Sequence, residues 1–178
     1  LSEEALKAAI EIYESTTSGG QVSDNSTSFH KVTDGSDQTD QARIHAAVEL
    51  FLTTGEEKYK EFLLSRVNFI TENISTLGWI ISRCVHRIGD EAFTKKIREA
   101  MLVLKADLDE QSKETPYGIP YRPYIWGAGW IIQRLGFEYY FLHKAFPDIF
   151  EPDLIFHALN FVLGCHPGSN TASFASGV

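Results

Sequence analysis

Apolar residues recur along this chain at the three- and four-residue spacing of amphipathic helices, and Gly or Pro residues separate the segments. The clearest stripe is formed by Ile44, Ala47, Val48 and Phe51. The spacing predicts about seven helices, over residues 1–14, 39–54, 56–70, 77–88, 91–110, 127–146 and 152–164. Strand-like alternation is not sustained anywhere. The pattern therefore predicts an all-α protein built from antiparallel helical hairpins.

Three segments beside these helices do not follow the helical pattern. Residues 16–40 are rich in Ser, Thr, Gly and Asp, and a loop of this length is often functional. Residues 115–126 contain three prolines, which the interior of a helix does not tolerate. A third loop follows Gly164 and contains Pro167.

Length and charge narrow the classes of function. The chain has 178 residues, which corresponds to one domain. Its 16 Lys and Arg against 24 Asp and Glu give a net charge of −8, which argues against nucleic acid as a partner. No apolar run approaches the ~20 residues of a membrane span, so no membrane partner is expected either. Cys84 and Cys165 lie far apart in the sequence and form neither a metal-binding spacing nor a disulfide framework.

The two ends of the sequence suggest a segment of a longer protein. The chain starts at Leu1 without a Met and without the pattern of a secretory signal. It stops at Val178 within a stretch rich in Gly and Ser. We therefore expect residues 1–178 to be a single, incomplete domain of a parent protein.

Aromatic residues are concentrated between Tyr117 and Phe156. Phe137, Phe141 and Phe156 lie within predicted helices and are expected in the core. The aromatic residues of the Pro-rich segment are different, because flat rings on a rigid loop can stack on the C–H faces of a sugar while tyrosine hydroxyls bind its hydroxyls. The alternative is that these rings close the end of a helical bundle. The residues concerned are Tyr121, Tyr124 and Trp126.

Two other groups of residues could carry chemistry. The acidic stretch 34–40 could hold a carboxylate pair or a calcium ion, but it lacks the EF-hand pattern, and Asp37 or Asp40 could instead cap the following helix. The six histidines show no metal-binding spacing, and no Gly-x-Ser-x-Gly motif is present. The sequence therefore predicts no metal, no cofactor and no catalytic residue from these patterns.

Three stretches together resemble glycoside hydrolase family 9, the cellulase family. Residues 46–55 (AAVELFLTTG), followed by EEKY, resemble the Ala-Ala-Glu-Leu-Tyr…Thr-Gly…Tyr hairpin of the family. Residues 124–127 (YIWG) open a predicted helix, as does the Trp-Gly-Ser segment of the family. Residues 160–164 (NFVLG) and 173–177 (SFASG) resemble its Asn-Tyr-Leu-Leu-Gly…Ser-Phe-Val-Thr-Gly signature. The order and approximate spacing of all three match over roughly residues 38–178.

The resemblance implies a fold, an activity and a partner. The family has a barrel of six helical hairpins, an (α/α)6 barrel, and hydrolyses β-linked glucan-type oligo- or polysaccharides by inversion. The implied substrate-binding residues are Trp126 and Tyr124, with Tyr121 and Trp130 as further candidates. The implied partners are the saccharide and the remainder of the parent barrel, with self-association of the fragment as an alternative. The family is typically secreted or periplasmic.

The resemblance also implies that the catalytic acid and base lie outside this chain. The general base of the family is in an Asp-x-Gly-Asp motif well before the first matching helix, and its general acid is a Glu well after the signature. The stretch 34–37 (DGSD) directly precedes the wrong helix and is not this motif. An inverting glycosidase needs both carboxylates, so this fragment alone is expected to be inactive.

The chain departs from the family pattern at several positions. Cys165 and His166 replace Arg-Asn, His45 stands where the family often has Trp, and Trp130 stands where it often has Arg. These departures suggest a divergent branch that acts on short or modified oligosaccharides. The competing hypothesis is a non-catalytic helical-hairpin domain for binding or scaffolding, although no repeat with the period of such modules is present.

Overall fold

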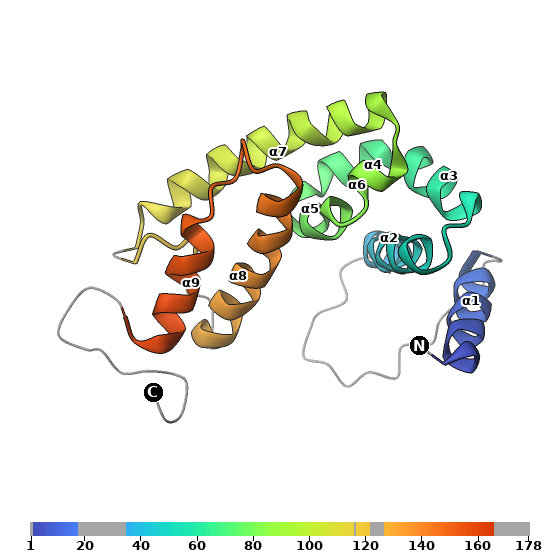
Figure 1. Ribbon diagram of the computed structural model, residues 1–178, viewed down its shortest axis with the longest axis horizontal. Coiled ribbons are helices and arrows are strands. Elements are labelled where there is room, and N and C mark those ends of the chain that lie inside the picture. Colours follow the sequence, from blue (N-terminus) through green and yellow to red (C-terminus); the bar gives the residue numbers. More distant parts are fainter. Residues whose placement is uncertain (1, 18–34, 116, 122–126, 166–178) are drawn as a thin grey trace. The chain divides into compact units, whose positions relative to one another are not determined.

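The computed structural model describes residues 2–17, 35–115, 117–121 and 127–165 (Figure 1). Every regular element within these ranges is a helix, so the prediction of an all-α protein is confirmed. The chain divides into two compact units, Leu1–Ser65 and Arg66–Val178.

The described residues of the first unit form three helices: α1 (Glu3–Thr17), α2 (Gly35–Thr54) and α3 (Glu57–Ser65). The predicted stripe of α2 is buried, with at most 4% of each side chain exposed. Gly55 ends α2 with a φ of +73° and donates its N–H to the carbonyl of Phe51 at 2.9 Å, so the chain turns directly into α3. Tyr13 of α1 contacts Tyr59 and Phe62 of α3 edge to face. The small core of this unit therefore combines aromatic rings with the aliphatic residues of the α2 stripe.

The helix α2 starts earlier than predicted, and this changes which residue can cap it. The helix begins at Gly35 rather than at residue 39, so Asp40 lies in its second turn. A side chain in the second turn cannot accept hydrogen bonds from the free backbone N–H groups of the first turn. The prediction that Asp40 caps this helix is therefore wrong. The side chain of Asp37 lies outside the described residues.

The second unit contains six described helices, which run from α4 to α9. Two predicted helices are each divided in two. The backbone leaves helical geometry at Arg66 (φ −100°, ψ 10°) and at Cys84 (φ −125°, ψ −10°). The apolar spacing continues across both positions, which is why the sequence pattern did not reveal them. The helices are α4 (Val67–Glu72), α5 (Ile74–Ser82), α6 (Val85–Ile88), α7 (Glu91–Ser112), α8 (Ala128–Ala145) and α9 (Asp153–Leu163).

The long helix α7 packs on α4 and α5. Its start is fixed by Asp90, whose side chain accepts the backbone N–H of Phe93 at 2.7 Å. Three of its apolar residues at helical spacing, Ile97, Met101 and Leu104, are buried. Gly78 of α5 faces this stripe, and the absence of a side chain there lets the two helices approach each other closely.

The helices α8 and α9 form an antiparallel hairpin (Figure 1). Three contacts establish the direction, because residue numbers rise along α8 while they fall along its partner. Ile132 packs with Phe161, Gly136 faces Ala158, and Tyr139 contacts Phe150, with ring centroids 5.4 Å apart. The N-terminus of α8 and the C-terminus of α9 therefore lie at the same end of the hairpin.

Two residues that were predicted to be in the core lie on the surface of this hairpin. Phe137 is 56% exposed and Phe156 is 55% exposed, so the expectation that both are core residues is wrong. Phe141 is half-buried, and its ring lies 6.2 Å from that of Trp79 in α5. Because α8 is apolar on several sides, the spacing of its residues did not indicate which side the other helices cover.

The contact between Gly136 and Ala158 predicts an unusual effect of a helix-favouring substitution. A Cβ atom at Gly136 would lie 2.9 Å from the Cβ of Ala158, which is too close for two carbon atoms. Gly136→Ala should therefore lower the free energy of unfolding by about 1–3 kcal/mol, the usual cost of overpacking, although Ala is normally favoured over Gly within a helix. Chemical denaturation measures this free energy.

Gly78→Ala is the matched control. Its new methyl group would meet the flexible end of Met101, at 3.3 Å from Cε, which can move aside. We expect little loss of stability there. Adding Ala158→Gly to Gly136→Ala should recover part of the loss, and a Gly136→Ala variant as stable as the wild type would contradict the close approach of α8 and α9.

Candidate functional site

A compact turn from Thr115 to Tyr121 connects α7 to the region before α8. The side chain of Thr115 closes this turn, because its Oγ1 donates to the carbonyl of Ile119 at 3.0 Å and accepts the N–H of Ile119 at 3.2 Å. The N–H of Tyr121 donates to the carbonyl of Ile119 at 2.8 Å. The Pro-rich segment was expected to be non-helical, and its described part has this defined structure.

Ile119 attaches the turn to the α8–α9 hairpin. Its side chain is 1% exposed and packs with Ile132 of α8 and with Ala158 and Phe161 of α9. Tyr117 adds an edge-to-face contact with Phe161, with ring centroids 5.1 Å apart. Burial of an Ile side chain contributes on the order of 1.5–3 kcal/mol. The turn is therefore held at the end of the hairpin where α8 starts and α9 ends.

The candidate sugar-binding residues are distributed unevenly in relation to this end. Tyr121 is half-buried and packs against the cluster around Ile119. Trp130, in the first turn of α8, is 70% exposed. Ile132, which belongs to the cluster, lies about 200° around the helix from Trp130, so these two side chains point to opposite sides of α8. Tyr124 and Trp126 lie outside the described residues.

Two segments of the family resemblance start from this same end. Gly127, with a φ of +86°, directly precedes α8, and Gly164, with a φ of +80°, ends α9. The sequence contains no Asp or Glu between Glu114 and Glu138, and none after Asp153. The sequence that leads up to Gly127 and the sequence that follows Gly164 thus contain aromatic and hydroxyl groups without any carboxylate.

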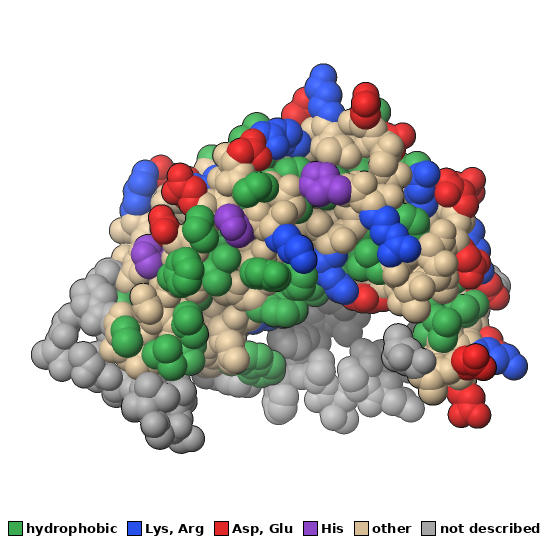
Figure 2. Space-filling view, viewed as in Figure 1, with side chains coloured by type: hydrophobic (Ala, Val, Ile, Leu, Met, Phe, Trp, Pro, Cys, Tyr) green, Lys and Arg blue, Asp and Glu red, His purple; other side chains and the backbone are tan. Residues whose placement is uncertain are grey.

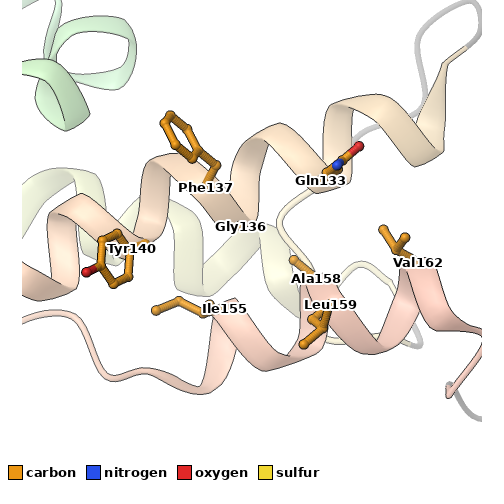
Figure 3. Close-up of a pocket in the computed structure, with 8 residues that line it drawn as sticks. All are labelled: Gln133, Gly136, Phe137, Tyr140, Ile155, Ala158, Leu159 and Val162. Atoms are coloured by element: carbon orange, nitrogen blue, oxygen red, sulfur yellow. The ribbon is translucent and has the colours of Figure 1, made fainter. Parts of the chain in front are cut away.

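An apolar groove runs along the side of the hairpin between α8 and α9. It has a volume of about 320 Å³, and most of its lining surface is hydrophobic (Figure 3). Three of its large side chains, those of Phe137, Tyr140 and Leu159, are each more than 40% exposed. Figure 2 shows hydrophobic side chains gathered over these two helices. The lining residues are Gln133, Gly136, Phe137, Tyr140, Ile155, Ala158, Leu159 and Val162.

The chemistry of the groove favours an apolar ligand. Gln133 and the hydroxyl group of Tyr140 are its polar side-chain groups. A sugar requires several hydrogen-bond partners for its hydroxyl groups, whereas the apolar face of a helix requires none. The groove and the aromatic end of the hairpin are therefore suited to different ligands. The sequence contained a signal for this surface in the several apolar sides of α8, but the spacing alone did not distinguish an exposed side from a buried one.

Titratable side chains in the described ranges form no cluster that could hold a metal ion. One histidine in α6 and one in α8 bind backbone carbonyls instead: Nε2 of His86 lies 2.8 Å from the carbonyl oxygen of Ala145, and Nδ1 of His143 lies 2.7 Å from that of Phe150. Both contacts are made around the connection between α8 and α9, which gives these histidines a structural role. Within the same ranges, no helix has the length and apolar character needed to cross a membrane.

Comparisons with protein-family models, with curated proteins and with solved structures returned no match to this chain.

Proposed function

We propose that this chain forms part of the barrel wall and of the substrate cleft of a glycoside hydrolase similar to family 9. The parent enzyme hydrolyses β-linked glucan-type oligo- or polysaccharides by inversion, in a secreted or periplasmic location. The chain contributes sugar-binding aromatic residues, and the catalytic acid and base come from other parts of the parent protein. The fold in this proposal is an (α/α)6 barrel, of which the α8–α9 hairpin is one unit.

The observation that carries the proposal is the convergence of two segments at one end of the α8–α9 hairpin. The YIWG segment leads into α8 at Gly127, and the NFVLG segment ends α9 at Gly164. These segments are separated by more than thirty positions in the sequence. In a barrel of antiparallel hairpins, the loops at one end of the helices surround the substrate. Two segments that resemble the same family therefore adjoin this end at Gly127 and Gly164, which supports a contribution of both to one cleft.

The chemistry of this end supports binding rather than catalysis. Inversion requires two carboxylates about 6.5–9.5 Å apart, on opposite sides of the bond that breaks and with a water between one of them and the sugar. The segments at this end contain no carboxylate. Aromatic rings bind a sugar by stacking without taking part in proton transfer. The role of these segments is therefore to bind the saccharide, while the rest of the barrel supplies the acid and the base on either side of the bond that breaks.

The apolar groove of α8 and α9 is a surface against which the rest of the barrel can pack. Exposed apolar surfaces of this kind usually form contacts with other protein segments. In the parent enzyme we assign this groove to a neighbouring helical hairpin. The same groove also supports the second candidate function, a non-catalytic binding or scaffold domain, in which it would receive a helix of another protein.

The first of three predictions from the proposed function separates the two candidate functions. The 178-residue chain assayed alone on β-linked oligosaccharides should show no hydrolysis, because its proposed role includes neither the acid nor the base. The full-length parent should cleave the same substrates and release products of inverted anomeric configuration, which proton NMR detects at early reaction times. Turnover by the purified 178-residue chain would refute the proposed division of roles, and an inactive parent would favour the scaffold domain.

The second prediction concerns Trp126. Trp126→Ala in the full-length enzyme should weaken oligosaccharide binding by on the order of 1–3 kcal/mol, the general cost of removing an aromatic anchor. Isothermal titration calorimetry or the KM for a short oligosaccharide measures this loss. The melting temperature should stay nearly unchanged, because a cleft residue packs against substrate rather than against the core.

Trp126→Phe is the matched variant, because it keeps an aromatic face of smaller area and should retain part of the affinity. The core alternative predicts a different pattern. If Trp126→Ala lowered the melting temperature strongly and the folded enzyme kept its normal affinity, Trp126 would be a packing residue.

The third prediction tests the apolar groove. The isolated chain should self-associate through it, because the partner helices are missing. Leu159→Glu places a charge in the groove and should shift the chain to the monomer in sedimentation velocity experiments. Leu159 is 51% exposed, so its replacement should change the stability of the monomer little. Val103→Glu on α7 is the control: Val103 is 70% exposed and lies outside the groove, and this variant should still associate.

A further inference from the structure

One polar contact joins the Thr115–Tyr121 turn to α9. Nδ1 of His157 lies 3.3 Å from the carbonyl oxygen of Gly118. A carbonyl only accepts hydrogen bonds, so Nδ1 carries the proton and donates it. His157 stands one position before Ala158, which packs against Ile119 of the same turn. The turn is thus held on α9 by a hydrophobic contact and by a neighbouring hydrogen bond.

Gly118 fits this contact in two ways. Its φ is +63°, a conformation that residues with a side chain rarely adopt. A Cβ atom at this position would also lie 3.2 Å from Nδ1 and 3.3 Å from Cε1 of the His157 ring. The missing side chain therefore lets the histidine ring lie against the backbone of the turn.

The hydrophobic contacts of Ile119 and Tyr117 hold the turn on α9, and the bond from His157 adds a directional restraint to them. Apolar contacts are non-directional, so Ile119 resists removal from its pocket more than rotation within it. The hydrogen bonds of Thr115 stabilise the turn internally but do not connect it to the hairpin. The bond from His157 is directional and is made beside the buried Ile119. It restrains the backbone of the turn three residues before Tyr121, which itself packs against the cluster around Ile119.

We propose that His157 is a positioning residue, which holds the Thr115–Tyr121 turn on α9 and thereby sets the position of Tyr121 for oligosaccharide binding. This inference rests on the proposed function of the chain as part of a saccharide cleft. His157 acts through the turn and does not itself contact the substrate. Its loss should therefore affect KM more than kcat.

Three substitutions in the full-length protein test this role. His157→Ala removes the donor. His157→Asn places an amide N–H close to the position of Nδ1 and should restore the bond. His157→Gln places its amide close to the position of Nε2 and should not. His157 is exposed, so all three variants should fold and have the melting temperature of the wild type.

Hydrogen exchange of the backbone amides measures how strongly the turn is fixed to α9, independently of enzymatic activity. In His157→Ala and His157→Gln, the backbone amides of Gly118, Ile119 and Tyr121 should exchange about 2- to 10-fold faster, the factor that corresponds to the net strength of one hydrogen bond. In His157→Asn they should exchange at the rate of the wild type. Equal exchange rates in all four proteins would show that the hydrophobic contacts of Ile119 and Tyr117 hold the turn without His157, and would overturn the proposal.

Kinetics on a β-linked oligosaccharide tests the consequence for binding. His157→Ala and His157→Gln should raise KM about 2- to 10-fold with kcat changed less than 2-fold, and His157→Asn should restore KM. Faster exchange with an unchanged KM would overturn the positioning role. An inactive wild-type protein would instead overturn the proposed function, and with it the substrate role of His157, while the exchange rates would still decide whether His157 holds the turn.

Discussion

The close approach of α8 to α9 at Gly136 and Ala158 is the constraint on which the second unit depends. Because only the methyl group of Ala158 lies between the two backbones there, the helices pack along their length, and their order in the chain makes them antiparallel. The antiparallel arrangement brings the start of α8 and the end of α9 together. It also creates the apolar groove along the side of the hairpin, since the residues around Gly136 and Ala158 line it. One close contact thus determines where both candidate surfaces lie.

The sequence predicted those parts of the fold that depend on local patterns. The stripe of α2 was identified correctly from the apolar spacing within that one helix. The divisions at Arg66 and Cys84 were missed, because the apolar spacing continues through them. The exposure of Phe137 and Phe156 was also missed. Whether an apolar side of a helix is covered depends on helices that are distant in the sequence, and the spacing within one helix contains no information about them.

Prediction of the candidate site from the sequence is limited in the same way, because the site also depends on residues that are distant in the sequence. The prolines of residues 115–126 indicated that this segment leaves the helix, and the structure agrees over its described part. Its attachment to α9 depends on Ile119 and Gly118, which contact residues almost forty positions away. Neither residue has an unusual chemical character, so nothing in the local sequence marked them. Tyr121 was selected for its hydroxyl and its ring, but its position depends on these neighbours.

The two surfaces of the hairpin differ in the kind of residue that forms them, and this difference follows from secondary structure. The groove consists of helical residues, whose backbone groups are already bonded within α8 and α9, so it offers a ligand mainly apolar side chains. The end of the hairpin consists of a turn and two glycine-terminated helix ends, where backbone and hydroxyl groups can point toward a ligand. A saccharide needs such groups together with a flat aromatic face, whereas a neighbouring helix needs only an apolar face. The geometry of one hairpin therefore separates a surface with polar and aromatic groups from an apolar surface.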